Sequence, residues 1–142
     1  DRIEFLFAPN PGEPFKPLKA IASSGEMARV MLALKTVLAS QDSIPILVFD
    51  EVDSNIGGET AGVVGEKMKQ IGDRRQVLCI THLAPVAASG HRHYLVSKEI
   101  VGGRTLTRVA QLDDDSRVEE LTRMLGGGGA AARQHAADLL NA

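Results

Sequence analysis

Two adjacent carboxylates, Asp50 and Glu51, end the apolar run "ILVFDE". An apolar strand that ends in acidic residues delivers them to the carboxyl edge of a parallel sheet, where open α/β folds bind their ligands. Such a pair suits phosphoryl transfer, because one carboxylate can hold Mg²⁺ through water while the other deprotonates an attacking water. The alternative is a pair of solvated acids at a strand end, since so short a motif is not specific by itself.

A second candidate site is the helix start formed by Ser23, Ser24, Gly25 and Glu26. The first N–H groups of a helix have no partner within the helix and attract anions, and a glycine there lets a phosphate approach the backbone. The spacing Ser23-x-x-Glu26 is also that of a capping box, which needs no ligand. Capping is the commoner use of such residues, so these four predict a helix N-terminus and leave open whether an anion binds there.

A third candidate is His82, which ends the run "VLCITH". A histidine at a strand end can hydrogen-bond a terminal phosphate or an attacking water, although a surface or helix-capping histidine is the commoner case. His91, His93 and His135 have no ligand-like spacing with Cys79 or with each other, so we predict no zinc site. Cys79 lies in an apolar run and is expected in the core; as the single cysteine, it fits a reducing compartment.

The elements that must position these residues follow from the spacing of apolar side chains. A helix is expected from Ser24 to Ala39, with so wide an apolar surface that most of its sides should be buried. Strands are expected at Ile46–Phe49 and Gln76–Thr81, with a helix at Glu59–Ile71 between them. This alternation is typical of a parallel sheet, in which the first strand would be covered on both faces.

The rest of the chain predicts shorter elements. Those expected, in chain order, are a strand at Ile3–Ala8, an irregular proline-rich segment at Pro9–Pro17, a short helix at Pro85–Ser89, two strands at His93–Lys98 and Thr105–Ala110 joined by a turn, and helices at Ser116–Leu125 and Ala130–Leu140 separated by four glycines. A capping box of Ser116 and Glu119 is expected to begin the first of these helices. With no repeat or linker visible, residues 1–142 are expected to form a single domain.

Composition narrows the class of protein. The chain has 142 residues and a net charge of −2, so it offers no strongly basic surface for nucleic acid. It contains four Phe, one Tyr and no Trp, which disfavours base stacking. No apolar run approaches the roughly 20 residues that span a bilayer, so no membrane partner is expected. The chain starts at Asp1 inside an apparent strand, which suggests a piece of a longer protein.

The motifs occur in the order found in ABC-type ATPase heads. The stretch "SSGE" resembles the ABC signature, "ILVFDE" resembles Walker B, "VDSNIGG" resembles the D-loop and "THLAPVAA" resembles the switch-histidine region. With "NPGEPFKPL", "KPLKAIASSGEMARVMLALK" and "RVEELTRMLGG", nearly the whole chain resembles the C-terminal part of an SMC-like family of bacterial DNA double-strand-break repair proteins. Ser24 departs from the pattern, because the signature normally has glycine there; its Cβ and hydroxyl would lie near the path of a phosphate.

This resemblance implies an α/β fold: the C-terminal lobe of an ABC/SMC-type ATPase head, mainly a parallel sheet with flanking helices. A P-loop of the form G-x-x-x-x-G-K-[ST] is missing, since Gly65 is followed by Glu66 in the nearest candidate. The chain's own N-terminal P-loop lobe, beyond a long coiled coil, would therefore supply the ATP cradle. The complete protein is expected to be a cytoplasmic, nucleoid-associated bacterial ATPase that acts on DNA in repair and recombination, whereas the isolated chain should be inactive.

The resemblance also implies a role for each site residue. Three would act on the ATP and Mg²⁺ of their own head: Glu51 as general base, Asp50 on Mg²⁺ and His82 as sensor of the γ-phosphate. The signature residues would bind the ATP of a second head in a homodimer: Ser23, Ser24, Gly25 and Glu26. Two D-loop residues would lie at the dimer interface: Asp53 and Asn55.

Two other classes of protein compete with this interpretation. ABC transporter nucleotide-binding lobes usually carry proline and a small residue after the acidic pair, where this chain has Val52 and Asp53, and they favour glutamine at the position of Glu26. A non-catalytic interaction module would have no need of Glu51 and His82, yet both are present. An ATPase assay of the complete protein distinguishes the non-catalytic interaction module from the SMC-like repair ATPase.

Overall fold

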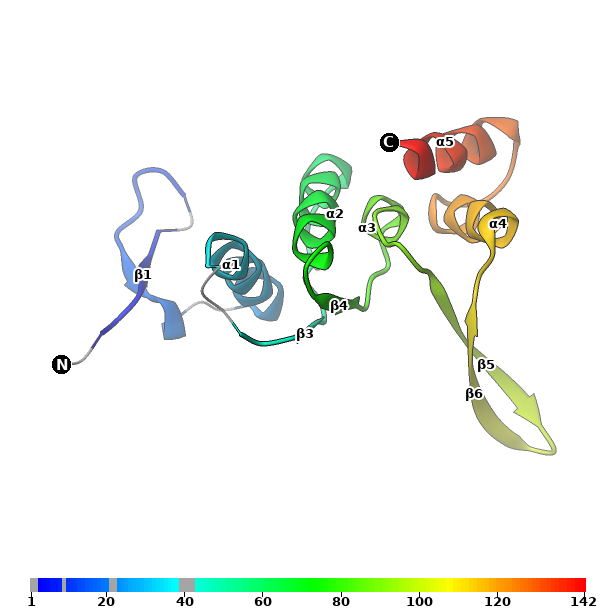
Figure 1. The fold of residues 1–142 in the computed structure, drawn as a ribbon, viewed down its shortest axis with the longest axis horizontal. Helices are drawn as coiled ribbons and strands as arrows, with labels where there is room; N and C mark the ends of the chain where they lie inside the picture. Colours follow the sequence, from blue (N-terminus) through cyan, green and yellow to red (C-terminus); the bar gives the residue numbers. More distant parts are fainter. Residues whose placement is uncertain (1–2, 9, 21–22, 39–42) are drawn as a thin grey trace.

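The computed structural model describes residues 3–8, 10–20, 23–38 and 43–142. The helices and strands follow one another along one long axis in nearly the order of the chain, and a two-stranded hairpin projects from the body (Figure 1). Two apolar clusters lie among the described residues. One belongs to a central unit that carries the predicted site residues, and the other to a group of helices nearer the C-terminus.

The central unit consists of helix α1 (Ser24–Val37), strand β3 (Ile46–Phe49), helix α2 (Gly58–Gly72) and strand β4 (Gln76–Cys79). The two strands pair in parallel, in a register that sets Phe49 opposite Cys79, and α2 supplies the crossover that parallel strands require. The described strands form three two-stranded sheets, and only this one is parallel. A mainly parallel sheet is therefore present only as this pair.

One face of the β3–β4 pair packs inward and the other is open. Leu47 and Phe49 are buried and join α2 residues in the central cluster, whereas Ile46 is 50% exposed and Val48 is 64% exposed. On β4, the neighbouring Leu78 is 48% exposed. The prediction that Ile46–Phe49 is covered on both faces is wrong for this chain, because no described element lies over the second face.

Helix α1 has the predicted start but less burial than predicted. The side chain of Ser23 accepts a hydrogen bond from the backbone N–H of Glu26 at 3.2 Å, which confirms the predicted N-cap. The buried residues of the helix are Gly25 and Leu32, so the prediction of burial on most sides is wrong. The predicted end at Ala39 lies outside the described residues; within them, the helix ends at Val37.

The N-terminal segment forms one small antiparallel sheet. Strand β1 (Leu6–Phe7) pairs with strand β2 (Lys16–Pro17), and a 3₁₀ helix follows at Leu18–Ala20. The predicted strand at Ile3–Ala8 is thus only two residues long, because its partner β2 offers only two residues for pairing. Within the segment predicted to be irregular, Lys16–Pro17 is a strand, while Pro9 lies outside the described residues.

The C-terminal part consists of helix α3 (Ala84–Ala88), strands β5 (Tyr94–Val101) and β6 (Arg104–Gln111), helix α4 (Asp114–Met124) and helix α5 (Ala130–Asn141). A second cluster, built on Leu121 and alanines, joins α3, α4 and α5. Helix α4 begins two residues before the predicted Ser116, because the carboxylate of Asp113 accepts the N–H of Ser116 at 2.9 Å. The predicted capping box is therefore wrong, and Asp113 is the cap.

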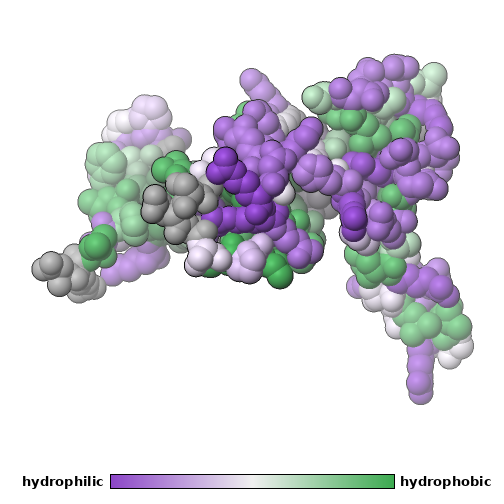
Figure 2. Space-filling view, viewed as in Figure 1, coloured by the Kyte–Doolittle hydropathy of each residue, from purple (hydrophilic) through white to green (hydrophobic). Residues whose placement is uncertain are grey.

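The β5–β6 hairpin is longer than predicted and carries apolar side chains into solvent. Its strands run to a turn at Gly102 and Gly103, where both φ angles are positive, 57° and 77°, as hairpin turns of this length favour. Figure 2 shows hydrophobic residues over the projecting hairpin, and Val96 and Ile100 are 62% and 80% exposed. Among the helices in the described parts of the chain, none combines the length and apolar character needed to cross a membrane.

Candidate functional site

The loop that follows β3 carries the predicted catalytic pair and holds an unusual backbone. Among the described residues other than glycine, only Glu51 and Asn55 have positive φ, at 56° and 60°. Asparagine tolerates this left-handed conformation better than most residues, whereas glutamate adopts it rarely. Such conformations persist where surrounding contacts hold them. Contacts from two sides hold the loop from Glu51 to Asn55.

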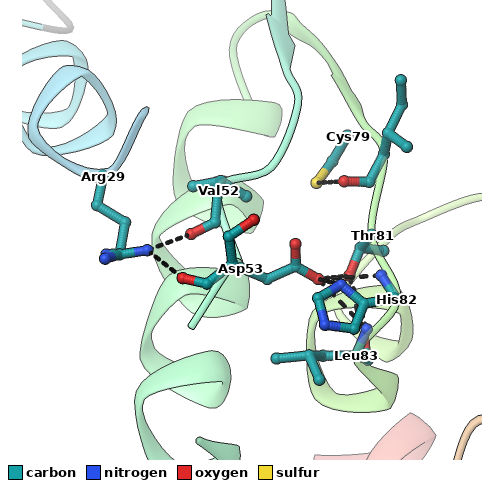
Figure 3. Close-up of polar contacts among 9 residues, drawn as sticks. Arg29, Val52, Asp53, Cys79, Thr81, His82 and Leu83 are labelled. Atoms are coloured by element: carbon teal, nitrogen blue, oxygen red, sulfur yellow. Dashed lines mark hydrogen bonds and ion pairs between the residues drawn. The ribbon is translucent and has the colours of Figure 1, made fainter. Parts of the chain in front are cut away.

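Helix α1 holds the loop from one side. The guanidinium Nη1 of Arg29 donates to the carbonyl oxygens of Val52, at 3.2 Å, and Ser54, at 2.9 Å (Figure 3). Nearer the helix start, a Cβ atom at Gly25 would lie 2.9 Å from the Cβ of Ser54 and 3.0 Å from the carbonyl oxygen of Glu51, which is too close. Glycine at position 25 therefore permits the N-terminus of α1 to rest directly on this loop.

The close contact between the N-terminus of α1 and this loop brings together two predicted site residues. The hydroxyl of Ser24 donates a hydrogen bond to Oε2 of Glu51, and both residues are exposed. A glycine at this position, as the ABC signature normally has, would lack this donor. The structure thus joins Ser24 and Glu51 within one chain, although the roles implied for them concern nucleotides on two different heads.

The segment after β4 holds the loop from the other side, through Asp53. This carboxylate is 1% exposed and points away from Arg29 (Figure 3). Its Oδ2 atom accepts hydrogen bonds from Thr81 Oγ1 at 2.5 Å, His82 N at 3.0 Å and Leu83 N at 3.3 Å. The same oxygen lies 3.2 Å from His82 Nδ1. Asp53, predicted at a dimer interface, therefore has its side chain inside this chain.

The electrostatics of Asp53 follow from these contacts. Burial acts to raise its pKa, but the hydrogen bonds from the Thr81 hydroxyl and the His82 backbone, together with the imidazole of His82, outweigh burial, so the pKa of Asp53 is lowered. Asp53 is therefore ionised at neutral pH. A buried charge is tolerated when donors surround it, as they do here.

The predicted metal ligand Asp50 lies at the end of β3 with its side chain exposed. Within the described ranges, no group of three or more His, Cys, Asp or Glu residues is arranged to hold a metal ion. That finding is compatible with Mg²⁺, which proteins often hold through one or two carboxylates while phosphate oxygens and water fill the other positions. Asp50 is suited to such a role, with Glu51 next to it.

Two residues at this site escaped sequence reasoning. Thr81 donates to Asp53, and Arg29 holds the loop by two carbonyls. Arg29 is the first basic residue in an otherwise largely apolar helix. A charged residue in such a helix indicates a polar partner, so the sequence could have identified Arg29 as a site residue. Thr81 was predicted to end a strand, whereas β4 ends at Cys79. Nothing in the local sequence distinguishes a donor to a buried acid from an ordinary strand threonine.

Cys79 provides a chemical test of the burial and the negative charge beside this site. Burial, and then the negative charges of Asp53 and Asp50, raise the pKa of the Cys79 thiol to about 12. The thiolate fraction at pH 8 is then roughly 10⁻⁴, so we expect slow labelling of native Cys79 by an aromatic disulfide reagent. Mass spectrometry of the peptide that contains Cys79 measures the rate, and the denatured protein is the control. Equal rates in the native and denatured protein would contradict this expectation.

Sequence comparisons identify close relatives. No protein-family model matches the chain. The chain is 50% identical over 137 residues to the DNA repair protein RecN of Xylella fastidiosa (strain Temecula1), which is 96% of this chain and 25% of that protein. It is 49% identical over 144 residues to RecN of Treponema pallidum and 42% identical over 142 residues to RecN of Bacillus subtilis. The chain thus spans about a quarter of the length of these curated relatives.

Structural comparisons agree on the fold. A chain from a study of ATP-driven dimerization and DNA-stimulated activation of SMC ATPases is similar with a TM-score of 0.56 and 20% identity, covering 87% of this chain and 81% of that one. The SMC head domain from Thermotoga maritima is similar with a TM-score of 0.50 and 28% identity, covering 72% of this chain and 37% of that chain. The fold is therefore similar to part of an SMC ATPase head.

Proposed function

The chain belongs to the RecN family of DNA repair proteins, and we propose on this premise that it is the C-terminal lobe of an SMC-like ATPase head. The observation that carries the proposal is the convergence of two segments on one loop. The signature-like start of α1 rests on the loop that follows β3, and Asp53 of that loop binds the segment that carries His82. In the printed sequence no P-loop accompanies them.

In the proposed reaction, Glu51 accepts a proton from a water molecule as the water oxygen attacks the γ-phosphorus of ATP. The bond from this phosphorus to the bridging oxygen breaks, which releases ADP. Asp50 would hold Mg²⁺, and this ion supplies charge neutralisation to the phosphates. His82 would contact the γ-phosphate. The chain's own N-terminal P-loop lobe would supply the cradle for this ATP, and the open apolar face of β3 and β4 is suited to packing against that lobe.

The signature residues would act on a second head. Ser23, Ser24, Gly25 and Glu26 surround the N-terminus of α1, whose unpaired N–H groups favour an anion. In a homodimer these groups would meet the γ-phosphate of the ATP bound by the partner head. Asn55 is exposed and would lie at this interface. DNA would bind through the complete protein, in the bacterial cytoplasm at the nucleoid.

The isolated chain provides the first test. It should neither bind nor hydrolyse ATP, because a P-loop supplies most phosphate contacts through its backbone N–H groups and lysine. Calorimetry with Mg-ATP should show no measurable binding to the isolated chain under conditions that give binding to the complete protein, with circular dichroism confirming that the isolated chain is folded. Micromolar affinity in the isolated chain would overturn the assignment of the cradle to another lobe.

The complete protein provides the second test. It should hydrolyse ATP, and hydrolysis should require head dimerisation. A complete protein that binds no ATP and has no ATPase activity would instead support a non-catalytic interaction module. The similarity to RecN, and Val52-Asp53 after the acidic pair, favour the repair ATPase over a transporter lobe.

A further inference from the structure

Asp53 has the contacts of a residue that orients another one. It is the only charged side chain among the buried residues of the described chain, at 1% exposure. All of its described polar contacts converge on Oδ2 and come from three consecutive residues: Thr81, His82 and Leu83. The imidazole of His82 is 68% exposed, so its ring is accessible while its anchor is buried.

These contacts determine both the backbone and the ring of His82. Leu83 is the N-cap of α3 and has no side-chain cap of its own. The carboxylate of Asp53 accepts the N–H of His82 and shares the N–H of Leu83 with the hydroxyl of Thr81. The carboxylate is also an acceptor for His82 Nδ1, 3.2 Å away, and therefore favours a proton on that nitrogen. Nε2 is then the ring nitrogen that meets a ligand: it accepts in the neutral ring and donates in the protonated ring.

Arg29 holds the loop on both sides of Asp53. Its guanidinium binds the carbonyls of residues 52 and 54, the two neighbours of Asp53 in the chain. The buried carboxylate is thus fixed from α1 on one side and bound to the segment after β4 on the other (Figure 3). The start of α1 and the histidine are connected by two successive sets of hydrogen bonds that meet at this loop.

We propose that Asp53 is a positioning residue for His82: it sets the orientation and the tautomer of the imidazole, and thereby affects ATP turnover without touching the nucleotide. This inference rests on the proposed function, because it assigns His82 a contact with ATP. Asp53 would act as the acid that orients a neighbouring histidine. Loss of Asp53 would change the orientation and tautomer of the His82 imidazole and leave the nucleotide cradle intact.

A double-mutant cycle in the full-length protein tests the inference. Asp53→Asn keeps the size of the side chain and one acceptor oxygen, but removes the charge that faces Nδ1. We expect kcat to fall by about 10-fold, at the lower end of what loss of an orienting partner costs a metal-bound histidine, with KM for ATP changed less than about twofold. In the background of His82→Ala, the same substitution should have no further effect. Additive losses in the cycle would overturn the proposal.

A second readout does not depend on turnover. In ¹⁵N-histidine spectra of the full-length protein, assigned by the loss of one signal in His82→Ala, the wild-type ring should carry its proton on Nδ1. Asp53→Asn should shift the population toward the Nε2–H tautomer. A wild-type ring protonated on Nε2 alone would overturn the positioning role. A protein that hydrolyses no ATP but keeps the Nδ1–H tautomer would refute the proposed function and the effect on turnover, while leaving the ring contact established.

Two further variants keep the test decisive. If Asp53→Asn does not fold, Thr81→Val removes the hydroxyl that donates to Oδ2 and accepts the N–H of Leu83 at 3.1 Å, and Thr81→Ser is the matched control that keeps this hydroxyl. The valine variant should show the loss of kcat and the serine variant should not; equal activity in both would count against the proposal. Asp138→Asn, at an exposed α5 carboxylate, controls for loss of an acidic charge elsewhere and should leave kcat unchanged.

Discussion

Glu51→Gln in the full-length protein should lower ATP turnover by about 10²–10⁴-fold while ATP still binds. The amide has the shape of the carboxylate but cannot take up the proton of the attacking water. Its carbonyl oxygen can still accept the hydrogen bond from Ser24, so the left-handed backbone at position 51 should survive the change. Because hydrolysis stalls after binding, head dimers stabilised by ATP should accumulate, and light scattering coupled to size exclusion should detect them.

A neighbouring acid provides the control for this result. Glu59→Gln, at an exposed position in the first turn of α2, removes one negative charge without touching the loop and should leave turnover unchanged. Turnover at the wild-type rate in Glu51→Gln would show that Glu51 is not the general base. Loss of ATP binding in that variant would show instead that the substitution disturbs the nucleotide site as a whole.

Ser23→Arg should separate the cap from the ligand site. The hydroxyl of Ser23 caps α1 through the N–H of Glu26, so loss of the cap alone should cost about 1 kcal/mol of the free energy of unfolding and leave turnover intact in the folded fraction. If the start of α1 faces a phosphate on a second head, the bulky side chain should block engagement, and dimerisation and turnover should fail together. Ser23→Ala removes the cap without the bulk and measures the first effect by itself.

Mixing two inactive variants tests the assignment to the second head. A Ser23→Arg head keeps its acidic pair, and a Glu51→Gln head keeps its signature. In a mixed dimer, one of the two composite sites has neither defect, because the base and the signature at any one nucleotide come from different heads. Partial recovery of ATPase activity is expected once subunit exchange is verified. Verified exchange without recovery would remove the main support for binding across the dimer.

The regular elements of the central unit follow from local patterns. Helix α2 was predicted at Glu59–Ile71 and is found at Gly58–Gly72, because apolar side chains at helical spacing face the strand pair. The strands β3 and β4 were predicted from continuous apolar runs, which do not tell whether a second face is covered. That depends on what packs against the strands, so the predicted burial of Ile46–Phe49 on both faces was wrong.

The order of the motifs identified the candidate site residues, but it did not predict where their side chains point. The motif order assigns Asp53 to an interface, and it does not reveal that this side chain is buried within the chain. It also does not reveal the left-handed φ of Glu51, which glutamate rarely adopts. The start of α4 was also predicted wrongly. Asp113 and Ser116 can both serve as an N-cap, and the spacing of residues alone does not tell which of the two begins the helix.

The open face of the β3–β4 pair affects how long the protein would survive in a cell before its lobes pack together. Ile46 and Val48 are exposed on these parallel strands, and no third described strand pairs at either edge. Surfaces of this kind bind chaperones and promote aggregation. Under the proposed assembly, a lobe that has not met its P-loop lobe would be retained or degraded, whereas an assembled head would escape. Chaperones and proteases would thus act on proteins in which this lobe has not packed against the P-loop lobe. Such proteins, which have a signature but no bound nucleotide, would be degraded before they could pair with a second head.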